Sequence, residues 1–179
     1  MKKQIISLIM ATVVSGATWV SAAQASDGSV HFTGEIIDTT CQVNEGLPNP
    51  LEVDLGKVAR SSFKSTAGTT SGTHSFQIKL SGCPATLNSV QIRFEGMEDP
   101  ANLDLLKLSP EAGVAEGVAI ELLDGFSNTP IPMRETSTTI YPVTAGNATL
   151  NLAARYKSTV ADVVAGKANA TTDFTIIYP

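Results

Sequence analysis

The feature that most constrains the fold is a series of short apolar segments separated by clusters of Gly, Ser, Thr, Asn and Pro. Within several segments, such as residues 76–80 and 90–94, apolar and polar residues alternate strictly. Alternation places the apolar side chains on one face of a β-strand. Many short strands with turn residues between them predict a β-sandwich or barrel. The expected strands cover residues 51–58, 74–82, 89–96, 117–124, 138–143, 148–156 and 171–178.

The remaining sequence indicates one all-β domain. Only residues 158–166 have a composition that suits a helical turn. No internal repeat, low-complexity tract or linker interrupts the chain. Its 179 residues, less a short N-terminal leader, are enough for a single domain with a sizeable core.

The N-terminus has the pattern of a secretory signal peptide. Lys2 and Lys3 precede a mostly apolar stretch at residues 5–20, and Ala23-Gln24-Ala25 supplies a small-x-small cleavage site. The apolar stretch is shorter than the roughly 20 residues that a membrane span needs. We therefore expect residues 1–25 to be removed and the mature chain to begin at Ser26. No later stretch has the length and hydrophobicity of a membrane span.

The charge of the mature chain excludes some classes of partner. Without Lys2 and Lys3 the net charge is −7, compared with −5 for the full chain. A chain this acidic does not favour binding to nucleic acid or to an anionic membrane surface.

The two cysteines, Cys41 and Cys83, indicate a disulfide. An even number of cysteines in an exported chain is typical of a disulfide framework. Neither cysteine has a nearby His or further Cys to complete a zinc site, and their spacing differs from a Cys-x-x-Cys redox motif. A bridge between them would stabilise the fold by roughly 4 kcal/mol through loop closure.

The sequence does not support an enzyme. His31 and His74 are isolated, and the chain has neither a Gly-x-Ser-x-Gly nucleophile motif nor a His-x-x-x-His metal motif. We expect no catalytic residue, no metal and no cofactor, so a structural or binding role is favoured.

Two strands lie near opposite ends of the mature chain. In residues 28–37, Val30, Phe32, Gly34 and Ile36 fall on one face. The chain then continues to Cys41 with no Gly or Pro turn, so no hairpin folds this strand back onto its own domain. We therefore expect residues 26–37 to form a projecting arm.

The second of these strands covers residues 171–178 and carries Phe174, Ile176 and Tyr178 on one face. Exposed apolar strands invite aggregation and are normally avoided, so an arm at one end and an open strand at the other are interpreted as complementary. An arm on one copy that meets an edge on another makes a heterologous contact, and such contacts build filaments.

Five stretches carry a resemblance to a known family: "GSVHFTGEIIDTTCQV", "VDLGKV", "FQIKLSGCP", "GVAIELLD" and "AGKANATTDFTIIYP". With them the chain resembles pilin subunits of the chaperone–usher class, and in particular the major subunits of type 1-like fimbriae. The family carries a Tyr next to last and a Gly fourteenth from the end, which are Tyr178 and Gly166 here. The positions of Cys41 and Cys83 match the disulfide of the family.

The resemblance implies an incomplete immunoglobulin-like β-sandwich, at residues 38–179, that lacks its seventh strand. It implies that Gly166, Phe174, Ile176 and Tyr178 belong to an acceptor groove that a periplasmic chaperone recognises. The donor strand would be the face formed by Val30, Phe32, Gly34 and Ile36. The implied partners are other pilin subunits, the chaperone and an outer-membrane usher, and the implied location is a cell-surface fimbrium reached through the periplasm.

Several alternatives remain open at this point. The chain also suits a minor or terminating subunit, or a monomeric secreted immunoglobulin-like module whose arm docks in its own groove. Gly166 alone is compatible with an ordinary turn glycine, and Gly34 with a β-bulge.

Overall fold

The computed structural model describes residues 30–33, 40–43 and 51–179. The chain divides into two units, residues 1–36 and residues 37–179, and each is described by itself. In the first unit Val30 and Phe32 are exposed, with 78% and 87% of their surfaces accessible. The expected signal peptide and the predicted donor residues Gly34 and Ile36 lie outside the described residues.

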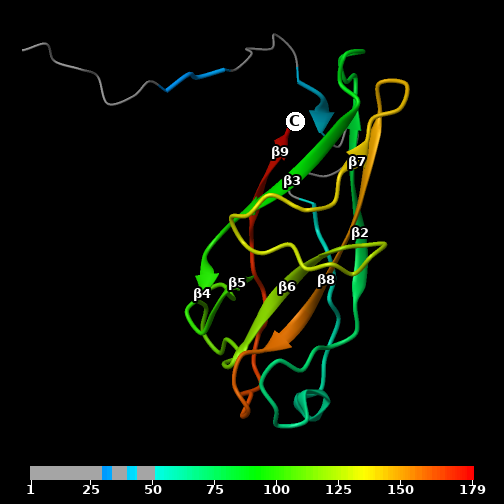
Figure 1. Cartoon of the computed structure of the whole chain (residues 1–179). Helices are drawn as coiled ribbons and strands as arrows, with labels where there is room; N and C mark the ends of the chain where they lie inside the picture. The colour runs from blue at the N-terminus through cyan, green and yellow to red at the C-terminus, as the bar shows by residue number, and fades with distance from the viewer. Residues whose placement is uncertain (1–29, 34–39, 44–50) are drawn as a thin grey trace, which may run out of the picture. The chain divides into compact units, whose positions relative to one another are not determined.

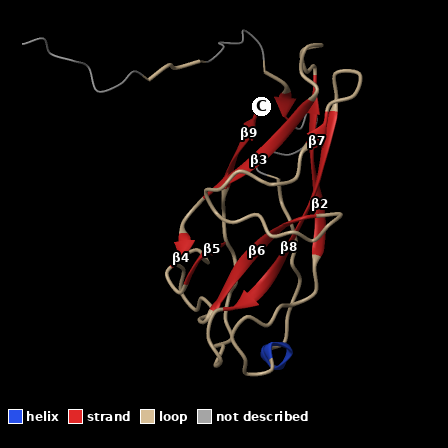
Figure 2. Cartoon of the chain, in the orientation of Figure 1, coloured by secondary structure: helices blue, strands red, loops and turns tan. Residues whose placement is uncertain are grey.

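The described residues of the second unit form strands and one short helix (Figure 2). The strands are β1 (Gln42–Val43), β2 (His74–Ser81), β3 (Ser89–Glu95), β4 (Glu98–Asp99), β5 (Asn102–Leu106), β6 (Val118–Asp124), β7 (Tyr141–Pro142), β8 (Ala148–Ser158) and β9 (Asp173–Ile177). The helix is a single 3₁₀ turn, η1 (Arg60–Phe63).

The strands form two antiparallel sheets. The larger sheet has the order β1-β2-β8-β6-β5-β4, and the smaller has the order β7-β3-β9. Strand β8 runs through the larger sheet and pairs with β2 on one side and with β6 on the other (Figure 1). Strand β9 lies beside β3 and forms one edge of the smaller sheet (Figure 1).

The core consists of alternate apolar side chains from both sheets. Ile78 of β2, Ile92 of β3, and Leu150 and Leu152 of β8 are each at most 1% exposed. Burying an aliphatic side chain of this size contributes roughly 1.5–3 kcal/mol. This strict alternation is the pattern seen in the sequence, and the predicted all-β, immunoglobulin-like sandwich is confirmed.

Part of the strand assignment is wrong. Residues 51–58 belong to no strand, because no backbone hydrogen bond joins them to any other described residue. The strand expected at 138–143 is limited to the two residues of β7. Strands β4 and β5 were not predicted.

The predicted helical turn at residues 158–166 is also wrong. This segment bonds instead to the residues before β6: the N–H of Thr159 donates to Gly117 at 2.8 Å, and Val164 exchanges two bonds with Glu116 at 3.0 and 3.1 Å. Partners far away in the sequence therefore override a weak local preference. The helical turn occurs at η1, where Ser62 N–H donates to Ala59 at 2.9 Å.

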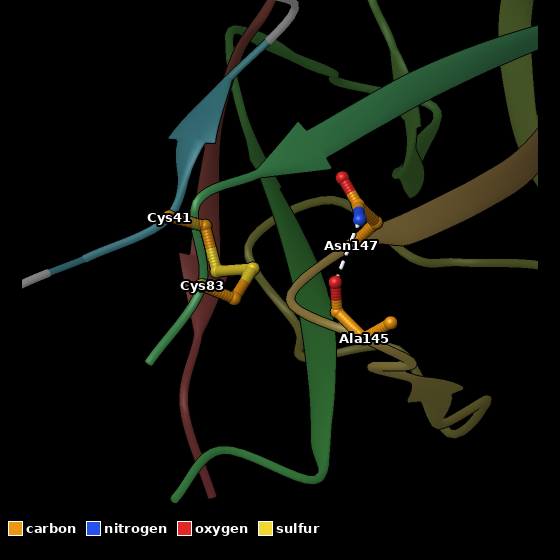
Figure 3. Close-up of a disulfide and its surroundings, with 4 residues drawn as sticks. All are labelled: Cys41, Cys83, Ala145 and Asn147. Carbon is orange, nitrogen blue, oxygen red and sulfur yellow. Dashed lines mark hydrogen bonds between the residues drawn. A yellow bond between two sulfur atoms is a disulfide. The ribbon is translucent and has the colours of Figure 1, made fainter. Parts of the chain in front are cut away.

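The predicted disulfide between Cys41 and Cys83 is confirmed (Figure 3). It joins the residue before β1 to a residue just after β2, two strands that are already paired. The N–H of Cys83 donates to the carbonyl of Gly146 at 3.0 Å, and the amide of Asn147 closes the adjacent turn by donating to Ala145 at 2.8 Å. The bridge thus anchors the chain beside the turn that enters β8.

Candidate functional site: an open strand edge

A cleft of about 540 Å³ opens between two extended segments of the second unit. Its floor includes Val118 and Ile120 from β6 and Tyr156 from β8, which also belong to the core. Residues 53–58 form one wall and residues 163–170 form the other. The cleft therefore exposes part of the core between two stretches of backbone.

The first wall has the alternation of a strand without its pairing. Leu55 is buried and Val53 half-buried, whereas Asp54 between them is exposed. Near the end of this wall, the N–H of Gly56 donates a local hydrogen bond to the Oδ1 atom of Asp54 at 2.8 Å. Apart from this bond, no hydrogen bond engages the backbone of residues 51–58 within the described part of the chain.

The second wall is paired on its outer side. The N–H and C=O groups of Lys167 bond to Gly113 and Ala115, both at 2.8 Å, and the C=O of Asn169 accepts from Ser109 at 2.7 Å. Successive residues of an extended chain direct their backbone groups to opposite sides. The backbone groups of the residues that alternate with Lys167 and Asn169 therefore point toward the cleft.

Strand β9 repeats this arrangement with β3. On β3, the C=O groups of Ile92 and Phe94 accept from Ser137 at 2.7 Å and Arg134 at 2.8 Å, so they face away from β9. The other residues of β3 must then bond to β9, and these are the partners of Asp173, Thr175 and Ile177.

It follows that Phe174, Ile176 and Tyr178 direct their backbone groups away from β3. In the second wall and in β9 alike, the odd-numbered residues bond to the neighbouring segment. The even-numbered residues from Gly166 to Tyr178 therefore direct their backbone groups to the opposite, unpaired side. Within the part of the chain that the structure describes, the one hydrogen bond to these groups runs from the hydroxyl of Tyr156 to the carbonyl of Ala168, at 2.9 Å. We call residues 166–178 the open edge.

The side chains of the open edge follow the same period. Ala168, Ala170, Phe174, Ile176 and Tyr178 are half-buried and pack against the core. The residues between them are exposed, except Thr172 and Ile177, which are half-buried. The open edge thus combines unpaired backbone groups with partly covered apolar side chains, which is what an added β-strand requires.

Close packing accounts for Gly166. Its φ does not lie in the left-handed region, so no turn requires a glycine here. A β-carbon at this position would lie 2.6 Å from the backbone nitrogen of Ala115 and as close to the carbonyl carbon of Val114. Only a glycine lets the second wall approach residues 113–115 this closely.

Tyr156 is a site residue that the sequence analysis missed. Burial raises the pKa of the Tyr156 phenol, and the negative charge of Asp54 raises it further. The hydroxyl therefore stays protonated and donates to Ala168, tying the second wall to β8. The sequence feature that could have identified Tyr156 is its alternating position near the end of the 148–156 segment.

The predicted site residues are thus only partly brought together. Gly166 lines the cleft, whereas Phe174, Ile176 and Tyr178 lie farther along the same open edge. Among the described residues, no group of three or more His, Cys, Asp and Glu is placed to hold a metal. In the same part of the chain, no helix has the length and apolar character needed to cross a membrane.

Comparison with known proteins identifies the family. The model of the family described as "Fimbrial protein" matches residues 30–179. The chain belongs to this family. A probable major fimbrial subunit, LpfA, of Escherichia coli O157:H7 is 37% identical over 179 residues, which cover 99% of this chain and 97% of the relative. A type-1 fimbrial protein subunit of Serratia marcescens is 41% identical over 187 residues and covers 99% of both chains.

Solved structures agree with this assignment. An antigen and type I fimbria protein of Burkholderia pseudomallei superposes with a TM-score of 0.59 at 37% identity, covering 84% of this chain and 97% of that one. The P pilus rod subunit PapA has a TM-score of 0.62 at 19% identity, covering 78% of this chain and 99% of PapA, which shows the shared fold. The fimbrial chain is therefore a type 1-like fimbrial subunit, and pilus subunits form polymers.

Proposed function

We propose that this chain is the repeating structural subunit of a chaperone–usher pilus and that it polymerises by donor-strand exchange. The open edge from Gly166 to Tyr178 supports this function most directly. Adding an extended segment to an unpaired edge satisfies its backbone groups and covers its apolar side chains, and pilin donor-strand complementation is a known case of such strand addition. No catalytic role is proposed.

The proposed donor is the arm of a second copy, residues 26–37. Its residues Val30, Phe32, Gly34 and Ile36 supply one apolar face, and Val30 and Phe32 are exposed in the isolated chain. Each large apolar side chain buried in the cleft would contribute roughly 1.5–3 kcal/mol. Gly34 suits a position where the cleft is too shallow for a side chain.

Export of the chain precedes its assembly. Residues 1–25 act as a signal peptide, and residues 38–179 form the pilin domain. In the periplasm a pilus chaperone lends a strand to the open edge, with Gly166, Phe174, Ile176 and Tyr178 among the residues it recognises. An outer-membrane usher then replaces that strand with the arm of the next subunit, and the fimbrium grows on the cell surface. Similarity to LpfA over the whole chain favours a major subunit over a minor or terminating one.

The decisive experiment removes the arm. Electron microscopy of cells that express the chain with its cognate chaperone and usher should show filaments, and deletion of residues 26–35 should abolish them. A pulldown should still recover the deleted chain with the chaperone, because the open edge is intact.

A matched control keeps the arm at full length and replaces His31 and Thr33 by Ser. These two side chains lie on the opposite face of the arm, so filaments should persist. Filaments of normal length from the chain without residues 26–35 would show that the arm does not donate a strand.

A further inference from the structure

The charges that line the cleft differ from those of the chain as a whole. The chain has 17 Asp and Glu residues against 12 Lys and Arg residues. In the cleft the balance is reversed, because Lys57, Arg60 and Lys167 line it together with one acidic residue, Asp54. A basic site in an acidic protein suits an acidic occupant.

Two of the three cations are free to bind such an occupant. Lys57 and Arg60 are exposed and make no ion pair or hydrogen bond through their side chains within residues 51–179. Lys167 pairs with Glu111 at 3.2 Å across the second wall. The carboxylate of Asp54 already accepts from the N–H of Gly56 at 2.8 Å. The net positive charge is therefore concentrated at the end of the first wall.

The occupant of the cleft proposed above carries a matching charge. On the arm, His31, Thr33 and Glu35 alternate with the apolar residues, so their side chains point away from the core when the apolar face is buried. Glu35 lies between Gly34 and Ile36, inside the apolar alternation, and it would therefore lie at the rim of the cleft. Asp27 precedes Val30, the first residue of that alternation, and lies outside it.

We propose that Lys57 and Arg60 form a basic rim that captures Glu35 from the arm of a second copy of this chain and places it at the Gly166 end of the open edge. This inference rests on the proposed donor-strand function and adds a residue-level determinant of which strand enters and in which position. Because the rim is exposed, the pairing acts mainly on the rate of association, and the buried apolar face determines how long the strand stays.

The test uses the full mature chain, in which each copy is both donor and acceptor. The initial rate of polymer formation is followed by light scattering and by native gel electrophoresis at low and at high salt. The double variant Lys57→Glu, Arg60→Glu should polymerise about 10-fold more slowly at low salt, and the difference should shrink at high salt. Adding Glu35→Lys to this variant restores opposite charges and should recover most of the rate.

Two controls separate the rim from overall charge. The variant Lys64→Glu, Lys107→Glu has the same net charge as the rim variant, but both positions lie outside the cleft lining, so its rate should stay within about 2-fold of wild type. Asp27→Lys should not rescue the rim variant, because Asp27 lies outside the apolar alternation. Circular dichroism should give the same unfolding midpoint for the rim variant and the Lys64→Glu, Lys107→Glu control as for wild type, because these four side chains are exposed or half-buried and lie outside the core.

The outcomes distinguish this inference from the function on which it rests. Equal rates for wild type and rim variant, or rescue by Asp27→Lys as strong as by Glu35→Lys, would overturn the basic rim and leave donor-strand exchange standing. A wild-type chain that forms no polymer at all would overturn both.

Discussion

The hydroxyl of Tyr141 donates to the Oδ2 atom of Asp124 at 3.0 Å, and this buried bond joins the two sheets. Tyr141 lies in β7 of the smaller sheet, and Asp124 ends β6 of the larger one. The other carboxylate oxygen accepts from the N–H groups of Phe126 and Ser127, at 3.1 and 2.7 Å, and from the hydroxyl of Ser127 at 2.7 Å. Asp124 therefore fixes the turn after β6 and holds the sheets together.

Replacing Tyr141 by Phe should lower the free energy of unfolding by about 1–3 kcal/mol, because a buried carboxylate loses a charge-assisted hydrogen bond. Urea unfolding followed by circular dichroism measures this change. Tyr178→Phe is the matched control, since within the described residues no hydrogen bond engages its hydroxyl, and its stability should not change. Equal stability of Tyr141→Phe and wild type would show that the bond does not stabilise the domain.

The same pair predicts how stability depends on pH. Burial acts to raise the pKa of Asp124, but hydrogen bonds, led by those from Ser127, outweigh it and hold the pKa below the ordinary 3.8. Burial, together with the hydrogen bond to Asp124 and its negative charge, raises the pKa of Tyr141 above the ordinary 10.0. The contribution of Asp124 is therefore present above pH 3.8 and lost as the pH falls further, and that of Tyr141 is present below pH 10.0 and lost as the pH rises beyond it.

This pH dependence is measured by urea unfolding across both ranges. Asp124→Asn should show a flatter acid limb than wild type, and Tyr141→Phe a flatter alkaline limb. An acid limb that is unchanged in Asp124→Asn would assign the loss of stability to other carboxylates.

Replacing Gly166 by Ala should destabilise the domain by about 1–3 kcal/mol, because the new β-carbon would overlap the backbone of residues 113–115. The second wall would have to move toward the cleft, so polymerisation should slow as well. Gly72→Ala is the control: a β-carbon there would meet nothing within 4 Å, and the φ of Gly72 is not in the left-handed region. Thermal unfolding that does not distinguish the two variants would refute close packing as the reason for Gly166.

Replacing Cys41 and Cys83 together by Ser should cost roughly 2–5 kcal/mol, because the unfolded chain regains the freedom that the bridge removes. The measurement is urea unfolding with and without a reducing agent, and the double variant should behave as reduced wild type does. Two reactive thiols in the unreduced, denatured wild-type protein would mean that the bridge does not form in the cell.

Tyr178→Ser should abolish recognition by the pilus chaperone and lead to degradation of the subunit, if the open edge is the acceptor. The change removes an apolar ring that packs against the core at the end of that edge. A pulldown with the chaperone, compared with Tyr178→Phe, measures the effect. Binding as strong as that of wild type would limit Tyr178 to a role in the core.

The sequence predicted best those strands that bury one face. The alternation around Ile78, Ile92 and Leu150 arises from side-chain packing against a core, and this packing is what stabilises β2, β3 and β8. Residues 51–58 show the same alternation, yet form no strand, because pairing depends on a neighbour that the alternation does not reveal.

The open edge was only half visible from the sequence. The face formed by Phe174 and Ile176 is readable as a period of two, but its continuation to Gly166 passes through Ala168 and Ala170, which give little hydrophobic contrast. Tyr156 was missed because its hydroxyl partner, the carbonyl of Ala168, belongs to backbone on another segment. The reason for Gly166 likewise depends on residues 113–115, which only the fold brings near.

The position of β8 has a consequence for how the domain folds. Its partners β2 and β6 both precede it, and His74 pairs with Ala154 across most of the domain sequence. The larger sheet cannot form until β8 pairs with β2 and β6. The folding nucleus of this sheet must therefore bring together residues that are far apart in the chain. Folding dominated by such distant pairs is slow and leaves strands unpaired for longer. The subunit can therefore aggregate at two stages. The first is during folding, before β8 has paired with β2 and β6, and the second is after folding, through the open edge.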